Sequence, residues 1–334
     1  WLAFTVVFLA GIGVISLVAG KDVVSALVHS LIYAPVLFLG GVMLTEPMTT
    51  PPTRGLRIMY GTLVGLLFLP VIHIGSFYLT PEIALLLGNV FSYLVSPKQK
   101  LVLVLRDRIR VAKDTFEFVF DSESPFSFKP GQYMEWTLAH DDADARSVRR
   151  YFTIASSPTE GDMRIGVKFY PEPSSFKEKL LSLRAGDRVV AAQLSGDFTL
   201  PKDTGRKLAF IAGGIGVTPF RSQVRYLIDH KEKRSITLLY ANKTPDDLAY
   251  KALFDEAGRE IGMRTSYVFT DSSPDRLSPG KLDGQTIARE IPDYRERLFY
   301  VSGPQGMVSG VQKTLRSMGV PGRNIKTDYF PGFA

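Results

Sequence analysis

The stretch IAGGIGVTPF, residues 211–220, decides the fold of the second half of the chain, because it closes an apolar strand and opens a helix. Gly213, Gly214 and Gly216 allow the backbone of such a turn to approach a diphosphate, and the free amides at the helix start then point at the anion. A turn built only for packing would show the same glycines. The position directly after a buried strand favours a nucleotide site.

The sequence around this motif shows two different patterns of apolar and polar residues. After Lys202, apolar runs such as KLAFIAGG, ITLLYAN and LFYVSG alternate with amphipathic helical runs, which predicts a parallel α/β sheet with helices on its faces. Between Lys100 and Lys202, alternating runs such as TFEFVF, GQYMEWTLA and RVVAAQL are separated by turn residues, and one helical run, SSFKEKLLSL, interrupts them. That pattern is typical of an antiparallel barrel. We therefore predict an antiparallel β-barrel over residues 98–202 and an α/β domain over residues 203–334.

A second motif, RRYFTIASSP at residues 149–158, ends one of the predicted barrel strands. Arg150 offers a guanidinium fork to a phosphate, Phe152 would cover an aromatic ring system, and Thr153 could hydrogen-bond to that ring. Ser174 and Ser175 lead into the helical run, where capping hydroxyls and free amides form another anion site. An ordinary helix cap is the alternative for the serines alone. Together with Arg150 they predict a phosphate site.

These motifs resemble those of ferredoxin–NADP reductases. RRYFTIASSP resembles the flavin-binding motif of that family, IAGGIGVTPF its nicotinamide-nucleotide glycine motif, and VSGPQGM (301–307) its third motif, all in order over about residues 100–334. The resemblance implies FAD held between barrel and sheet by Arg150, Tyr151, Phe152, Thr153, Ser174 and Ser175. It implies NAD(P)H over Gly213, Gly214, Gly216, Thr218, Ser302, Gly303 and Pro304. Thr153 and Ser302 would be the catalytic residues beside the reacting rings.

This sequence departs from the family pattern at two of these positions. Phe152 stands where tyrosine is commoner, so one phenol hydrogen bond is missing. Ser302 stands where many members have cysteine, a change that the site tolerates because it needs a small polar group more than a thiol.

The first 97 residues have a different composition, with few charges and long apolar runs. Spanning a bilayer takes about 20 mostly apolar residues. Four segments reach or approach that length: Trp1–Gly20, Val23–Thr45, Ile58–Leu79 and Ile83–Val95. We therefore predict about four transmembrane α-helices over residues 1–97, embedded in a lipid bilayer. Because the chain opens on an apolar Trp1, we interpret the N-terminus as truncated.

The connection TEPMTTPPTRG, residues 45–55, follows the second apolar segment. Basic residues in this connection and after the fourth segment place both on the cytoplasmic side, which predicts a multi-pass protein of the cytoplasmic (inner) membrane with cytoplasmic reductase domains. The connection and LTPEIALLLGNVFSYLVSP are similar to the closing helices of the membrane subunits of Rnf complexes and sodium-translocating NADH:quinone reductases. That resemblance implies a membrane flavin, FMN or riboflavin, near Thr45, Glu46, Thr49, Thr50 and Thr53. A proline-stiffened helix connection is the alternative.

Two histidines, His29 and His73, fall within the predicted spans at similar depth. A bis-histidine haem, as in ferric reductases or NADPH oxidases, is one interpretation, and neutral histidines hydrogen-bonded between helices are the favoured one. The chain has no cysteine, which excludes disulfides and thiolate metal sites, and we predict no bound metal. The net charge of +7 comes without basic runs interleaved with aromatics, so nucleic acid is not an expected partner.

These features together predict a membrane-bound oxidoreductase that passes electrons from NAD(P)H through FAD to a membrane-embedded or trans-membrane acceptor. The acceptor would be a quinone, a flavin or a protein. Lys243 could meet the 2′-phosphate of NADPH, while the likeness of the membrane part favours NADH, so the choice stays open. Tyr329, Phe330 and Phe333 could shield the flavin until nicotinamide displaces them. A non-enzymatic assembly or sensor module is the alternative function.

Overall fold

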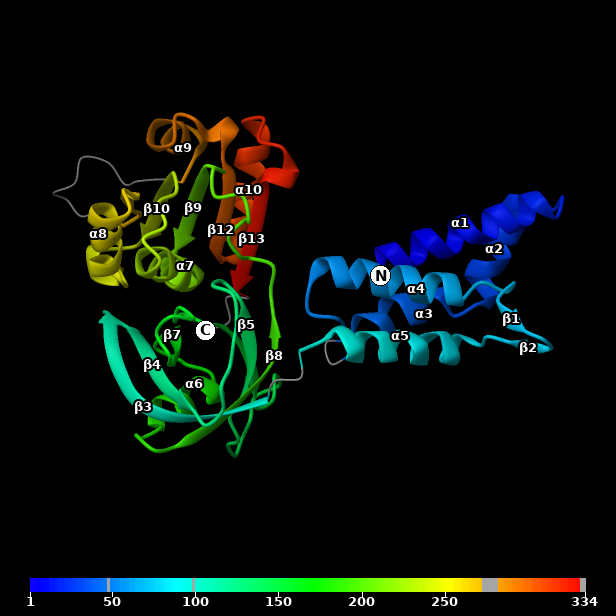
Figure 1. The fold of residues 1–334 in the computed structure, drawn as a ribbon, viewed down its shortest axis with the longest axis horizontal. Coiled ribbons are helices and arrows are strands. Elements are labelled where there is room, and N and C mark those ends of the chain that lie inside the picture. The colour runs from blue at the N-terminus through cyan, green and yellow to red at the C-terminus, as the bar shows by residue number, and fades with distance from the viewer. Residues whose placement is uncertain (47–48, 98–99, 272–281, 331–334) are drawn as a thin grey trace. The chain divides into compact units, whose positions relative to one another are not determined.

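The computed structural model describes residues 1–46, 49–97, 100–271 and 282–330. The chain divides into two compact units, Trp1–Lys98 and Gln99–Ala334 (Figure 1). We call the first of these the helical unit. The second, whose motifs resemble those of ferredoxin–NADP reductases, we call the reductase unit after that resemblance.

The helical unit consists of short apolar helices around one core. Its helices are α1 (Leu2–Val18), α2 (Val23–Tyr33), α3 (Val36–Gly41), η1 (Met43–Thr45), α4 (Arg54–Leu67) and α5 (Pro81–Val95), and a small hairpin, β1 (His73–Ile74) with β2 (Phe77–Tyr78), precedes α5. Gly61 and Gly65 lie on one face of α4, where an added Cβ would come within 3.2 Å of the Phe4 nitrogen and 2.9 Å of the Phe4 oxygen respectively. This glycine spacing lets α1 and α4 approach closely, as small residues do in membrane helix pairs.

The structure corrects two of the predicted spans. The third, Ile58–Leu79, is wrong: α4 ends at Leu67, and the hairpin β1–β2 follows. Pro70 cannot continue a helix, and Gly75 adopts a positive φ of 62° between the two strands of the hairpin. The second, Val23–Thr45, is interrupted at Ala34 and Pro35, where α2 ends and α3 begins.

Among the described residues, no single helix is both long and apolar enough to cross a membrane. Val23–Tyr33 and Val36–Thr45 meet the length and composition criteria only as a pair, with a bend of 65° between them. The helices Leu2–Val18 and Pro81–Val95 are apolar but shorter.

The first half of the reductase unit is a six-stranded antiparallel sheet. Its strands are β3 (Lys100–Ala112), β4 (Thr115–Ser122), β5 (Tyr133–Thr137), β6 (Arg149–Thr153), β7 (Met163–Lys168) and β8 (Arg188–Ser195), in the order β6-β5-β8-β3-β4-β7. The antiparallel sheet is as predicted, but within the described part of the chain no ladder pairs β6 with β7, so it forms a half-barrel rather than a barrel. Trp136, Phe118 and Phe120 fill its concave side, together with Phe176 of α6 (Ser175–Ser182).

The second half is a five-stranded parallel sheet, as predicted. Its strands are β9 (Leu208–Gly213), β10 (Ile236–Asn242), β11 (Arg264–Phe269), β12 (Leu298–Pro304) and β13 (Ile325–Phe330), in the order β11-β10-β9-β12-β13. Core contacts place α7 (Thr218–Asp229) and α8 (Lys251–Glu260) on one face and α9 (Gly284–Glu290) and α10 (Gln305–Ser317) on the other. The sequence analysis missed α9. α8 begins only at Lys251, because Pro245–Asp247 forms a 3-10 turn and Tyr250 has a φ of 60°.

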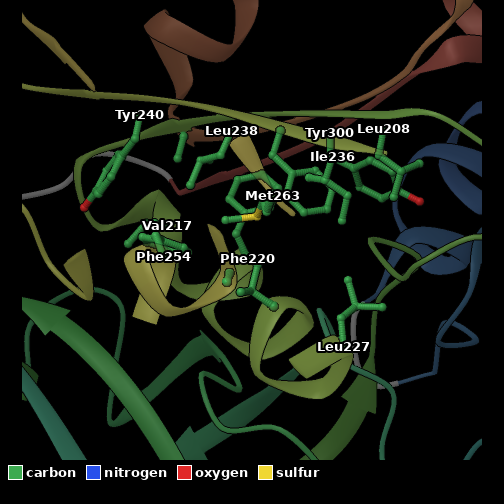
Figure 2. Close-up of a cluster of buried hydrophobic side chains, with 14 of the residues drawn as sticks. Leu208, Val217, Phe220, Leu227, Ile236, Leu238, Tyr240, Phe254, Met263 and Tyr300 are labelled. Carbon is green, nitrogen blue, oxygen red and sulfur yellow. The ribbon is translucent and has the colours of Figure 1, made fainter. Parts of the chain in front are cut away.

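Both faces of the parallel sheet are buried, which explains its near-continuous apolar strands. Figure 2 shows the core on the α7–α8 side, where Leu238 and Tyr240 of β10 lie near Phe220 and Phe254 of the helices. This core fixes the end of β9 and the start of α7. The candidate nucleotide turn is therefore held by packed elements on its sheet side.

Candidate functional site

The strand order of the parallel sheet reverses direction between β9 and β12. These neighbours pair in parallel, with Ser302 opposite Ala212, yet the helices that follow them, α7 and α10, cover opposite faces of the sheet. The carboxyl ends of two such strands flank a topological switch point, the usual ligand site of open α/β sheets. Both predicted nucleotide motifs, IAGGIG and VSGP, end at this point.

The three glycines of the motif have different structural surroundings. An added Cβ on Gly216 would lie 2.5 Å from the Gly303 Cα, and one on Gly213 would lie 2.1 Å from the Met307 sulfur. Gly216 is therefore required by the close approach of the turn η2 (Gly214–Val217) to the backbone of β12, whereas the neighbour of Gly213 is a flexible methionine side chain. Gly214 has a φ of 52°, and no described atom lies within 4 Å of its hypothetical Cβ. Of the three, Gly214 is the one that leaves open space for a ligand.

Ser302 is a buried polar residue at this switch point. It is fully buried, and its hydroxyl has no hydrogen-bond partner in the described part of the protein. Leaving a buried hydroxyl unpaired costs about 1–3 kcal/mol, so such groups are typical of sites that gain a partner from a ligand. Thr218 donates from its hydroxyl to the Ile215 carbonyl at 3.2 Å, and Pro304 is exposed.

Asp328 is a candidate functional residue that the sequence analysis missed. In the parallel register of β12 and β13 it lies opposite Ser302. Burial raises the pKa of Asp328 to about 6, although a backbone hydrogen bond from Tyr329 opposes the shift. An acid within the apolar-alternating run IKTDYF was the available signal. Of the predicted shielding aromatics, Tyr329 is 53% exposed, Phe330 ends β13, and Phe333 lies outside the described residues.

The flavin motif lies on β6, an edge strand of the half-barrel. Arg150 and Phe152 both contact Phe176 of α6: the guanidinium carbon lies 5.3 Å from the Phe176 ring centre, and the two phenyl rings are 5.8 Å apart. Tyr151 contacts Tyr133 of β5 instead, at 5.8 Å between rings, and is 45% exposed. Arg150 and Phe152 therefore meet α6, while Tyr151 is directed elsewhere.

Thr153 and Tyr151 occupy the remaining motif positions. Thr153 is buried at the end of β6, opposite Tyr133 in the β5–β6 ladder. Burial, with a smaller contribution from Glu135, raises the pKa of the Tyr151 phenol, so it stays protonated. Its hydroxyl lies 3.4 Å from the Gln193 amide oxygen.

The Arg150 side chain is only 12% exposed and is held on two edges. Its Nη1 donates to the carbonyls of Arg146, Ser147 and Arg149 at 2.9, 2.8 and 2.7 Å. Its Nη2 donates to both carboxylate oxygens of Asp144, at 2.7 and 2.6 Å. Its Nε is buried and has no partner among the described residues. The predicted phosphate ligand is thus in place, but part of it already binds an anion.

The predicted serine ligands at α6 differ from each other. Ser174 is the N-cap residue of α6 and makes no side-chain capping bond. Ser175 accepts the Asp144 N–H at 3.1 Å, and its oxygen lies 3.0 Å from His140 Nε2. A guanidinium with a free Nε, a helix N-terminus and a neighbouring aromatic pair together fit the phosphate and ring of a flavin nucleotide.

The half-barrel and the parallel sheet meet beside the nucleotide turn. A Cβ on Gly166 of β7 would lie 2.6 Å from the Tyr250 hydroxyl and 2.8 Å from Thr218 Cγ2, so this glycine allows the contact. Arg221 of α7 forms an ion pair with Glu160 and lies 3.4 Å from Glu117, two acids of the half-barrel side. This buried network fixes the position of the turn against the half-barrel.

A cavity of about 770 Å³ adjoins this network, lined by residues that include Thr159, Glu160, Arg164, Arg221 and Tyr250. None of the predicted flavin or nucleotide residues lines it. Its three arginines are all engaged in ion pairs. We therefore interpret it as a feature of the domain junction rather than as the cofactor site.

In the helical unit, the predicted polar loop makes local bonds. The hydroxyl of Thr45 donates to the Gly41 carbonyl at 2.8 Å, and that of Thr50 donates to the Glu46 carbonyl at 2.6 Å. Thr49 also donates to the Glu46 carbonyl, at 3.4 Å, and Thr53 caps α4 by accepting the Leu56 N–H. These contacts are those of a capped helix connection.

The two histidines of the haem interpretation do not both lie in helices. His29 is in α2 and packs on Tyr33 with ring centres 4.5 Å apart. His73 is in β1, where its Nδ1 lies 2.8 Å from the Gly75 oxygen. The expectation that both lie within helical spans is wrong, because α4 ends before His73.

Comparison with known proteins agrees with this geometry. The Amycolatopsis cytochrome P450 reductase has a TM-score of 0.62 at 24% identity, covering 70% of this chain and 71% of that one. The flavohem-like FAD/NAD binding domain of the Vibrio cholerae nitric oxide dioxygenase gives 0.61 at 21% identity, covering 70% and 99%. Residues 210–313 match the family described as Oxidoreductase NAD-binding domain. The second unit therefore has a ferredoxin reductase-like fold, within which residues 210–313 match an oxidoreductase NAD-binding domain.

Related sequences extend the comparison. The reductase unit is similar to the glycine betaine monooxygenase reductase subunit of Chromohalobacter salexigens, at 27% identity over 61% of this chain and 56% of the relative. It is similar to an NADPH oxidoreductase of Mycobacterium tuberculosis, at 29% identity over 59% and 51% respectively. The chain thus spans just over half the length of these relatives. The matched family is described as NAD-binding, and the Vibrio cholerae neighbour is an FAD/NAD binding domain. These descriptions support FAD and NAD(P)H as the cofactors.

Proposed function

We propose that the chain is a membrane-attached NAD(P)H-dependent flavin oxidoreductase that passes electrons from NAD(P)H through FAD to an acceptor in or beyond the bilayer. The observation that carries the proposal is the topological switch point, where the Ser302 hydroxyl, unpartnered among the described residues, lies beside a nucleotide turn that packs against the half-barrel. A ligand with a polar edge would satisfy this hydroxyl, and the turn would hold its phosphates.

The chain's own residues would bind and orient the two cofactors. Arg150 and the N-terminus of α6 would hold the flavin phosphate, with Phe152 and Phe176 beside them. Gly214 and the start of α7 would receive the diphosphate of the nicotinamide nucleotide. FAD, when bound, supplies a carrier that accepts a hydride and can release electrons singly. Ser302 would donate a hydrogen bond at the nicotinamide end, with the carboxyl of Asp328 on the neighbouring strand.

The outer surface of the helical unit supports the membrane part of the proposal. Many large apolar side chains are exposed on it, including Val6, Leu17, Val24, Ile32, Leu37, Phe38, Leu86 and Leu94. Apolar surface of this extent is typical of a face that contacts lipid or protein. The close glycine contacts between α1 and α4 are of the kind that stabilises helices in lipid. The polar loop with Thr45, Glu46, Thr49, Thr50 and Thr53 would then be the place where electrons enter the helical unit.

Rapid mixing of the flavin-loaded protein with NADH or NADPH, without oxygen, tests the enzymatic part. Loss of flavin absorbance with either nucleotide supports the proposal. The nucleotide that reduces the flavin faster is then the physiological donor. A flavin that binds but stays oxidised with both nucleotides contradicts it and favours the assembly-module alternative. A flotation assay with lipid vesicles tests attachment: the full chain should float with the vesicles and resist a high-salt wash.

A further inference from the structure

The segment HDDADARS, residues 140–147, joins β5 to β6 and folds onto the start of α6. Asp144 in this segment contacts two of the three predicted phosphate ligands, Arg150 and Ser175. Its carboxylate binds the guanidinium of Arg150 through both oxygens, at 2.7 and 2.6 Å, and its backbone N–H donates to the Ser175 hydroxyl at 3.1 Å. One residue of the chain thus occupies the place that the motifs assign to a ligand anion.

The Asp144 side chain is an anion in this position. Desolvation opposes ionisation, but hydrogen bonds from the Arg146 N–H and from Arg150 outweigh it and lower the pKa of the carboxyl. The Arg146 N–H bond is 2.8 Å long. A carboxylate and a phosphate use the same fork of a guanidinium, so the two ligands compete for the same donors.

Arg150 would keep its position if Asp144 left. Its Nη1 is held by three backbone carbonyls at 2.7–2.9 Å, and its ring contact with Phe176 does not involve Asp144. Its Nε already lacks a partner among the described residues. Departure of the carboxylate would therefore open the Nη2–Nε edge of the guanidinium, which is the edge that a phosphate needs.

We propose that Asp144 is an internal competitor for the flavin phosphate. It occupies the anion site formed by Arg150 and the start of α6 until a phosphate-bearing flavin replaces it, and it thereby sets how tightly FAD and FMN are held. The inference rests on the flavin site of the proposed function. It makes Asp144 a determinant of affinity for the phosphate ester and leaves the ring-binding residues untouched.

The test compares the dissociation constants of FAD, FMN and riboflavin for the wild-type full chain, D144N and D142N. The D144N variant would keep the shape of the side chain but lose its charge, so FAD and FMN should bind about ten-fold more tightly, the usual effect of one charged hydrogen-bonded contact. Riboflavin has no phosphate, and its affinity should not change. D142N removes the same charge two residues away, at a position with a φ of 53° that asparagine tolerates, and should bind all three flavins as the wild type does.

A second measurement uses the wild-type protein alone. Displacement of Asp144 would loosen the segment around Arg146, so FAD should accelerate tryptic cleavage after Arg146 while riboflavin should not. Unchanged cleavage with saturating FAD would overturn the inference even if D144N failed to fold.

The outcomes separate this inference from the proposed function. Weaker FAD binding by D144N would make Asp144 a residue that orients Arg150, and equal binding would give it no role; either result overturns the inference alone. A folded wild-type chain that binds neither FAD nor FMN overturns the proposed function itself.

Discussion

On the half-barrel side of the reductase unit, Arg150 already holds an anion, the Asp144 carboxylate, whereas on the sheet side the Ser302 hydroxyl has no partner among the described residues. The first site is satisfied internally and must exchange one anion for another when a ligand binds. The second site is left unsatisfied and gains a new bond. The difference shows that a buried charge needs a partner at all times, while one neutral hydroxyl can remain unpaired at modest cost.

The two sides also differ in how their backbones are fixed. Gly216 allows the nucleotide turn to pack directly on the backbone of β12, so the sheet side is rigid. On the half-barrel side, the ligand-binding group is a side chain. The Arg150 guanidinium is held by carbonyls of the preceding turn and by the Phe176 ring. Substitution of Arg150 should therefore act mainly on ligand affinity, and substitution of Gly216 mainly on fold stability.

The largest effect is expected from Arg150→Ala. The variant loses the charged donors for the flavin phosphate and leaves Asp144 without its main partner, so FAD affinity should fall about 100-fold. Fluorescence titration with FAD measures this change. Arg149→Ala is the matched control, since the Arg149 side chain is half exposed and lies 3.7 Å from Glu135. This variant should change the FAD affinity by less than about three-fold. Equal losses in both variants would show that charge density, not the Arg150 position, binds the flavin.

Gly216→Ala tests the rigid sheet side. The new methyl group would lie 2.5 Å from the Gly303 Cα, so β12 or the turn must shift, and the free energy of unfolding should fall by about 1–3 kcal/mol. Urea unfolding of the apoprotein measures it. Gly310→Ala in α10 is the control: no described atom lies within 4 Å of its added Cβ, and the variant should gain about 0.5–1 kcal/mol. A neutral Gly216→Ala would contradict the packing explanation.

Ser302→Ala separates ligand binding from stability. Because the hydroxyl has no partner among the described residues, its removal should leave the unfolding free energy unchanged or slightly higher, while the rate of flavin reduction should fall about ten-fold through the lost hydrogen bond to nicotinamide. Ser222 is an equally buried serine whose hydroxyl donates to the Ser156 carbonyl at 2.6 Å. Ser222→Ala should show the reverse, losing about 1 kcal/mol of stability with little change in rate. Identical behaviour of the two variants would remove the distinction.

The smallest effect is a pH dependence at Asp328. Its pKa is about 6 in the folded protein against an ordinary value of 3.8, so the folded state binds the proton more tightly than the unfolded state. Wild-type stability should therefore fall as pH rises from about 4 to 6, by about 1 kcal/mol once partial exposure is allowed for. Relative to wild type, Asp328→Asn should gain Tm across this window and level off above it. A constant Tm difference between pH 4 and 7 would contradict the assignment.

Local pattern was sufficient to predict the elements of the reductase unit. The strand around IAGG ends in glycines and is followed by Thr218 and Pro219 at the start of α7, so strand, turn and helix were all encoded within ten residues. The alternation in TFEFVF and RVVAAQL likewise matches β4 and β8. Such signals come from residues that are neighbours in the sequence, so they can be recognised without knowledge of the tertiary structure.

The features that the sequence could not reveal depend on contacts between distant residues or on competing local signals. The pairing of Asp328 with Ser302 comes from the register of β12 and β13, and the contact of Asp144 with Ser175 joins residues 31 positions apart. In the helical unit, hydropathy alone extended one helix across Pro70, although a proline and a glycine turn end it at Leu67. Apolar composition does not distinguish a long helix from a short helix followed by an apolar hairpin.

We expect the half-barrel and the parallel sheet together to bind a flavin that NAD(P)H reduces. The most direct test is to titrate the purified, folded chain with FAD and then add NADH or NADPH in the absence of oxygen while recording the flavin spectrum. The account predicts binding of one FAD per chain, followed by loss of its absorbance with at least one of the two nucleotides. A folded protein that takes up neither FAD nor FMN, or whose bound flavin keeps its oxidised spectrum with both nucleotides, would contradict it.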